Sequence, residues 1–99
     1  ADLTDASLGD ANLTNANLDE ADLTDAYLRY ADLTDAILLN ADLTNAYLYG
    51  ANLTDAILYG ADLTDASFYT ATVTNANFAN TIWSNTVWTD GVTYNTNQA

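Results

Sequence analysis

The chain contains no cysteine, histidine or proline, and Arg29 is its only basic residue. Without cysteine it cannot form disulfides or bind metal through thiolates, and nothing can be inferred about its redox compartment. Without histidine, cysteine or lysine, only carboxylates and tyrosines could act as general acids or bases. These absences exclude most catalytic and metal-binding chemistries.

Recognisable catalytic motifs are also missing. The sequence has no glycine-rich phosphate loop, no HExxH and no nucleophile beside a base, and the Asp-rich residues 5–15 lack the spacing of an EF-hand loop. The carboxylates recur in regular series, which we expect on a convex surface without a pocket. The sequence therefore predicts no enzyme, no catalytic residue, no cofactor and no metal site, with cation binding along stacked carboxylates as the alternative.

Acidic residues dominate the charge. The chain has 14 Asp and Glu residues and a net charge of −13 at pH 7, which disfavours nucleic acids and anionic membranes as partners. No stretch is apolar and long enough for a membrane helix or a signal peptide. Because the first residue is not methionine and the repeat is already in register there, we expect a mature or truncated chain. We expect it to be soluble, in the cytoplasm or, if processed, in the periplasm or thylakoid lumen.

What the sequence does contain is a five-residue repeat. Across residues 1–80 every group begins with alanine, and the third position is leucine from Leu3 to Leu63. On an α-helix, successive groups would be displaced by about 140°, so the leucines would line no face. In a straight strand, the alternating spacings of two and three would place them on both faces. The pattern fits a chain that turns once per group, with positions one and three inward and the others outward, so that changes at Asn40 or Thr70 should hardly affect stability.

The groups ADLTD, ANLTN, ADLTN and ANLTD resemble the motif of the pentapeptide-repeat proteins, which is a small residue, Asp or Asn, Leu and two freer positions. This resemblance covers most of the chain. It implies an all-β fold, a right-handed quadrilateral β-helix (a solenoid) with four pentapeptides per coil. About five coils stacked about 4.8 Å apart would give a rod of about 24 Å. We expect residues 1–80 to form the β-helix and residues 81–99 to form an irregular last coil, a cap and a polar tail.

The repeat pattern loosens from Thr81 onward. Thr81 and Thr86 replace the inward alanine, and Trp83 and Trp88 replace leucine. Larger side chains therefore occupy the inward positions where the stack ends. Repeat proteins need terminal caps because an open β-helix end exposes unpaired backbone groups. We expect the tryptophans to form a structural cap, with an aromatic ligand site as the alternative, and residues 89–91 to form a turn. The segment TIWSNTVWTDG is similar to the closing segment of many cyanobacterial members of the family.

The amino-terminal coil has no comparable cap. Ala1, Leu3, Ala6 and Leu8 would lie on an uncovered coil. This end is therefore frayed, paired end to end with another molecule, or continuous with further residues. We favour pairing or further residues, and the sequence does not choose between them.

Odd and even groups differ, so the true repeat is ten residues long and opposite sides of a coil share their chemistry. Equivalent residues of the odd groups would lie above one another in successive coils, in columns that we call files. The odd groups predict files of Asp, Asn and Thr, and one of them is Asp2, Asp22, Asp42 and Asp62. Like charges about 4.8 Å apart repel by about 1 kcal/mol in water. We expect hydrogen bonds from backbone N–H groups at the corners to offset this repulsion. Ice binding through the Thr files is discounted, because Asp or Asn flanks each file.

The even groups place aromatic and aliphatic side chains outward. Exposed patches of this kind are typical of contact surfaces, in which Tyr and Arg are frequent. Cross-strand aromatic files also stabilise a sheet with no partner present, by about 0.2–1 kcal/mol per pair, and a cation–π contact alone would account for Arg29. The candidate interaction residues are Tyr27, Arg29, Tyr47, Tyr49 and Tyr69 on one side, with Tyr30 at the corner, and Ile37, Leu39, Ile57 and Tyr59 on the other.

These features favour a non-enzymatic scaffold that presents flat faces to a protein partner or to its own copies. The alternative is an acidic DNA mimic acting on a DNA-binding protein, because the resemblance includes members that protect DNA gyrase by occupying its DNA-binding surface. The predicted length matches only about seven base pairs. The tyrosine-rich side would also interrupt a continuous negative surface, so the scaffold is the favoured hypothesis.

Overall fold

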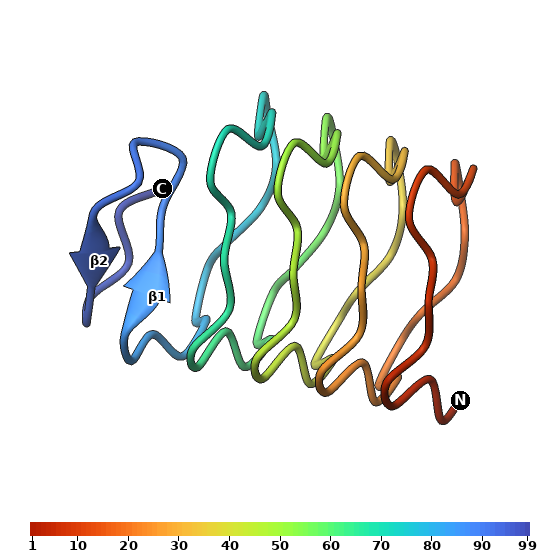
Figure 1. The fold of residues 1–99 in the computed structure, drawn as a ribbon, viewed down its shortest axis with the longest axis horizontal. Helices are drawn as coiled ribbons and strands as arrows, with labels where there is room; N and C mark the ends of the chain where they lie inside the picture. Colours follow the sequence, from red (N-terminus) through yellow and green to blue (C-terminus); the bar gives the residue numbers. More distant parts are fainter.

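The computed structural model describes residues 1–99, which wind into a stack of coils with the termini at opposite ends (Figure 1). Parallel single-residue bridges join the second position of a group to the residue twenty positions later, as in Asp2 with Asp22 and Asp22 with Asp42. One coil therefore contains four groups of five residues. The two regular strands, β1 (Thr86–Val87) and β2 (Thr93–Tyr94), pair antiparallel at the carboxyl-terminal end.

Backbone hydrogen bonds explain the five-residue period. Within a coil, the Ala6 N–H donates to the Leu3 carbonyl at 3.0 Å and closes a turn. Between coils, the Leu3 N–H donates to the Asp22 carbonyl at 2.7 Å, and the Asp5 N–H donates to the Thr24 carbonyl at 2.9 Å. The same set recurs around the inner coils. It leaves only the N–H of the fourth position and the carbonyl of the fifth position without a backbone partner.

The fifth residue of each group has a positive φ, from Asp5 to Asn85. It is the third residue of the turn, and type II turns require a positive φ there. Asp and Asn adopt this conformation more readily than other non-glycine residues, which explains why they dominate the position. The expectation that the fifth position is free is therefore wrong on conformational grounds. Thr70, a β-branched residue with φ of 60°, is the clearest mismatch.

Replacing Thr70 by asparagine should raise the free energy of unfolding by about 0.5–1 kcal/mol, because asparagine relieves the strain of a β-branched residue at positive φ. Urea denaturation measures the change. Thr74→Asn is the matched control, since Thr74 is not among the positive-φ residues, and it should change stability by less than about 0.5 kcal/mol. A Thr70→Asn protein that is less stable than the parent would contradict the assignment.

Alanine and leucine fill the interior. The third-position leucines from Leu23 to Leu63 are 0% exposed, and the first-position alanines from Ala21 to Ala66 are at most 1% exposed. Phe68 continues the leucine positions and is also 0% exposed. The buried side chains form one continuous core along the stack, which confirms that positions one and three point inward.

Burial decreases toward the amino-terminal end. Ala1 is exposed, and Leu3 and Leu8 are half-buried. Leu18, at 8% exposed, is the first buried leucine. These side chains are less buried than those of the inner coils because a coil lies against them on one side only.

The carboxyl-terminal residues form a hairpin, in a segment for which the sequence predicted a short polar tail. The expected turn is present, with the Gly91 N–H donating to the Trp88 carbonyl at 2.9 Å. After it, β2 pairs with β1, and Asn97 Nδ2 donates to the Phe78 carbonyl at 2.8 Å. The sequence pattern missed the hairpin because these residues no longer follow the five-residue repeat.

The molecule measures 27 × 23 × 21 Å and is thus almost as wide as it is long. Its surface has no pocket. No helix in the structure has the length and hydropathy needed to cross a membrane.

Candidate interaction faces

In the odd groups, the N–H of the fourth position has no backbone partner. It donates instead to the side chain of the second position. The Thr44 N–H and Oγ1 donate to Asp42 Oδ1 at 3.0 and 2.6 Å. Asn52 accepts the same two bonds from Thr54, at 3.1 and 2.6 Å. These local bonds close each turn. The expected backbone donors are confirmed, and the threonine hydroxyl is an additional donor that the sequence analysis did not foresee.

These bonds favour the charged carboxylate. The pKa of Asp32 lies below its ordinary value because the Thr34 hydroxyl, and then the Thr34 N–H, donate to it. Thr4 lowers the pKa of Asp2 in the same way, while desolvation and the neighbouring Asp22 charge act in the opposite direction. The odd-face carboxylates thus serve the turns, and no three of the acidic side chains converge as a metal cluster would require.

We expect stability to be constant above about pH 5 and to fall below about pH 4. Because the pKa values of Asp2 and Asp32 are lowered in the folded state, the unfolded chain binds more protons. Their contribution is present above the unfolded pKa and is lost as the pH falls through the folded pKa. Asp32→Asn keeps the acceptor, as Asn52 shows, so urea midpoints from pH 3 to 7 should fall less steeply in this variant. An identical pH dependence in both proteins would contradict the assignment.

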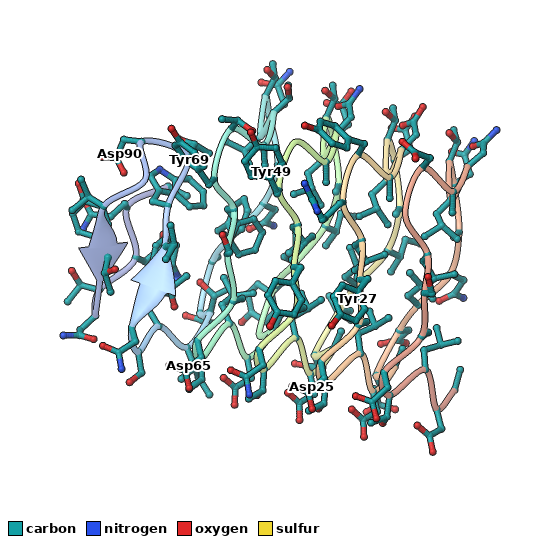
Figure 2. The ribbon with its side chains drawn as sticks, in the orientation of Figure 1. Asp25, Tyr27, Tyr49, Asp65, Tyr69 and Asp90 are labelled. Atoms are coloured by element: carbon teal, nitrogen blue, oxygen red, sulfur yellow. The ribbon has the colours of Figure 1, made fainter.

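The even groups build two further faces. We define the tyrosine face as Tyr27, Arg29, Tyr30, Tyr47, Tyr49 and Tyr69, three of which are labelled in Figure 2. The rings of Tyr27 and Tyr47 stack with centroids 4.9 Å apart and planes 7° apart. Tyr49 makes edge contacts with Tyr30 and Tyr69, each at 5.5 Å. The Arg29 guanidinium carbon lies 5.3 Å from the centre of the Tyr49 ring. The structure therefore brings the predicted aromatic residues together.

Much of this face is open to solvent. Tyr27 is 49% exposed, Tyr47 45% and Tyr69 43%. Tyr49, which contacts two other rings, is only half-buried. The outward orientation predicted from the repeat is thus correct, although Tyr49 is more enclosed than the other rings.

The aliphatic face consists of Ile37, Leu39, Ile57 and Tyr59. Ile37 and Ile57 are bridged between adjacent coils and are 36% and 38% exposed. Leu39 is half-buried. The Tyr59 hydroxyl accepts a hydrogen bond from Asn80 Nδ2. This face contains no ring stack and is less continuous than the tyrosine face.

The even groups show what the second position can do when it holds asparagine. Asn17 accepts the Asp19 N–H at 3.1 Å, and Asn77 accepts the Ala79 N–H at 2.9 Å. Tyrosine and isoleucine offer no acceptor at this position. The four even groups with tyrosine or isoleucine therefore leave the fourth-position N–H without a protein partner, at Arg29, Leu39, Tyr49 and Tyr59, and so do the two groups with serine, at Gly9 and Tyr69.

The two tryptophans lie in an aromatic cluster at the carboxyl-terminal end. Trp83 and Trp88 are 7% and 8% exposed, with ring centroids 4.9 Å apart. The Trp88 ring also lies 5.2 Å from Phe78 and 5.6 Å from Phe68. Trp83 Nε1 donates to Thr81 Oγ1 at 2.7 Å. The cluster thus fills the end of the core, and Trp88 directly follows β1.

The stacked coils, the regular register and the single core define a β-helical repeat protein. The family model for pentapeptide repeats matches residues 1–38 and 36–75, with 8 copies. The chain belongs to the pentapeptide-repeat family, whose members fold as right-handed β-helices.

Solved cyanobacterial structures agree with this assignment. The alr5209 protein of Nostoc PCC 7120 is 34% identical, with a TM-score of 0.65 over 97% of this chain and 77% of that one. HetL of Nostoc sp. PCC 7120, involved in heterocyst differentiation regulation, is 32% identical, with a TM-score of 0.55 over 94% of this chain. Rfr23 of Cyanothece 51142 is 33% identical, with a TM-score of 0.52 over 88% of this chain. The chain spans 47% of HetL and 63% of Rfr23, and a search of curated proteins finds no match.

Proposed function

We propose that this chain is a non-enzymatic scaffold whose even faces bind a protein partner or a second copy of the chain. In this proposal the scaffold is a quadrilateral β-helix of about five coils of four pentapeptides. Residues 1–80 form the helix, and residues 81–99 close it. The supporting observation is the choice of side chain at the second position of the even groups.

Asparagine at this position satisfies a backbone N–H, as Asn17 and Asn77 show, and a hydrogen bond of this kind is worth about 0.5–1.5 kcal/mol. Tyr27 and Tyr47 forgo that bond and stack instead, which is worth about 0.2–1 kcal/mol per pair. Since the two options are of similar size, stability alone does not require exposed rings. A contact surface accounts for rings that remain 49% and 45% exposed.

A double variant, Tyr27→Asn with Tyr47→Asn, tests the tyrosine face. Because asparagine caps the turn, we expect the variant to unfold within a few degrees of the parent and to lose association. Sedimentation over a range of concentrations tests self-association, and affinity capture with each protein as bait tests partner binding. Ile37→Asn with Ile57→Asn is the matched control for the other face. An unchanged association state together with the same captured proteins in both variants would argue against contact faces.

The ends of the stack have separate proposed roles. Trp83 and Trp88 cap the core, supported by their burial against Phe78. At the opposite end, the N–H groups of Asp2 and Ser7 have no backbone partner. This first coil is suited to pair end to end with another molecule or with a further coil.

Mimicry of DNA is less well supported. The second and fourth positions of the tyrosine face carry Arg29 and no carboxylate, so the negative surface is interrupted along one whole side. The longest dimension is also only 27 Å. A gyrase supercoiling assay without inhibition at micromolar protein would remove this alternative.

A further inference from the structure

The stacked tyrosine pair has two uncovered ring faces. Its file runs through Ser7, Tyr27, Tyr47 and Ser67 in successive coils. Tyr27 and Tyr47 cover one another's inner faces, with planes 7° apart. A serine side chain is too small to cover the outer faces. The face of Tyr47 above Ser67, and that of Tyr27 above Ser7, can therefore each accept one more flat group.

The charge around this file is strongly asymmetric. The second and fourth positions of the tyrosine face contain no carboxylate. The corner residues that lie two positions before Ser7, Tyr27 and Ser67 are Asp5, Asp25 and Asp65. Figure 2 shows Asp25 and Asp65 along that corner. A chain with a net charge of −13 attracts cations, and these corner carboxylates place negative charge along one edge of the tyrosine face, although the corner residue that precedes Tyr47 is Asn45.

Arg29 shows how a cation lies on this surface. Its guanidinium carbon is 5.3 Å from the centre of the Tyr49 ring and 6.0 Å from that of Tyr30, within the range of cation–π attraction. Arg29 is the only basic residue of the chain. The stacked pair of Tyr27 and Tyr47 therefore has no cation of its own.

The geometry points to an arginine side chain, carried by a basic segment of a partner protein, as the occupant of the outer Tyr47 face. This inference rests on the proposed contact role of the tyrosine face and names the chemistry of its partner. The planar guanidinium stacks on Tyr47 above Ser67, and the Asp65 carboxylate supplies the opposite charge. Ser7, Tyr27 and Asp5 form an equivalent site at the other end of the pair. A basic segment in extended conformation suits a flat surface without a pocket.

Three synthetic peptides, in which serine alternates with arginine, lysine or citrulline, test the inference by calorimetric titration at fixed ionic strength. Citrulline has the flat shape of arginine without its charge, and lysine has the charge without the shape. We expect arginine to bind most tightly, ahead of lysine by about two- to fivefold per occupied ring, and citrulline to bind least. Rising salt should weaken the binding of the arginine peptide.

Matched variants locate the site. Tyr47→Asn should weaken the arginine peptide by about two- to fivefold and reduce its advantage over lysine, and adding Tyr27→Asn should abolish that advantage, whereas Ile57→Asn on the aliphatic face should change neither. Asp65→Asn and Asp55→Asn each remove one negative charge from a fifth position, with φ of 57° and 59°. Both variants reduce the net negative charge equally, so Asp65→Asn should weaken binding of the arginine peptide more than Asp55→Asn does. Thermal unfolding verifies that each variant is folded.

Three outcomes would overturn the inference. They are equal affinity for arginine and lysine, equal losses within each matched pair, and no binding of the arginine peptide. A different result would contradict the proposed function, namely an unchanged association state and the same captured proteins in the Tyr27→Asn, Tyr47→Asn variant. A face that binds a neutral partner or its own copy would pass that test and fail this one.

Discussion

Replacing Leu48 by alanine is expected to lower the free energy of unfolding by about 2–5 kcal/mol. Leu48 is 0% exposed, with coils on both sides, so removing its isobutyl group opens a cavity. The narrow interior is lined by backbone that is hydrogen-bonded between coils, which limits how far the walls can relax. Urea denaturation at neutral pH measures the change.

Leu8→Ala is the matched control, because Leu8 occupies the same position within a coil but is only half-buried in the first coil. Removing its side chain leaves a space that solvent already reaches, and we expect a loss of about 1 kcal/mol. Equal losses at Leu8 and Leu48 would mean that the two side chains are equally enclosed, which would contradict the lower burial of the first coil.

Replacing Ala46 by leucine is expected to cost at least about 1–3 kcal/mol through overpacking. Ala46 is 1% exposed, and its neighbours Leu43 and Leu48 are 0% exposed. The added isobutyl group therefore finds no space unless the hydrogen bond from the Ala46 N–H to the Leu43 carbonyl, at 2.9 Å, is strained. A thermal midpoint well below that of the parent is the expected result.

Ala6→Leu is the control for this substitution, because Ala6 has the same place in the uncovered first coil and is only half-buried. Its added side chain can extend over the open end, so we expect a much smaller loss. Thr86 occupies the position of Ala46 two coils further along the stack and is larger than alanine. It is 0% exposed, and its Oγ1 donates to the Leu63 carbonyl at 2.7 Å. If Ala46→Leu melted like the parent, the inward assignment of the first position would be wrong.

The hydrogen bonds at the second position make the scaffold proposal testable without unfolding the protein. Substitutions of exposed aromatic residues often confuse lost binding with lost stability, because the rings also stack on each other. Asparagine avoids this problem here, since Asn17 and Asn77 already occupy equivalent sites and cap the following turn. The face can thus be changed while the coil is kept.

The sequence alone determined the family, the β-helical fold class and the orientation of most side chains. A spacing of two and three between small and large apolar residues has few physical solutions, and a turn in every group satisfies it. The burial of Ala46 and Leu48 and the exposure of Tyr47 all follow from that one rule. The sequence also placed the candidate interaction residues on two opposite sides, because alternate groups must fall on alternate sides of a four-sided coil.

The tertiary structure alone decided three further features. It gave the fifth residue a positive φ, as at Thr70, which the residue type there does not indicate. It chose how the rings meet, stacked for Tyr27 and Tyr47 and edge-on for Tyr49 and Tyr69. It also returned β2 to β1 as a hairpin. These features depend on which atoms approach across coils twenty residues apart, and a local pattern holds no information about such contacts.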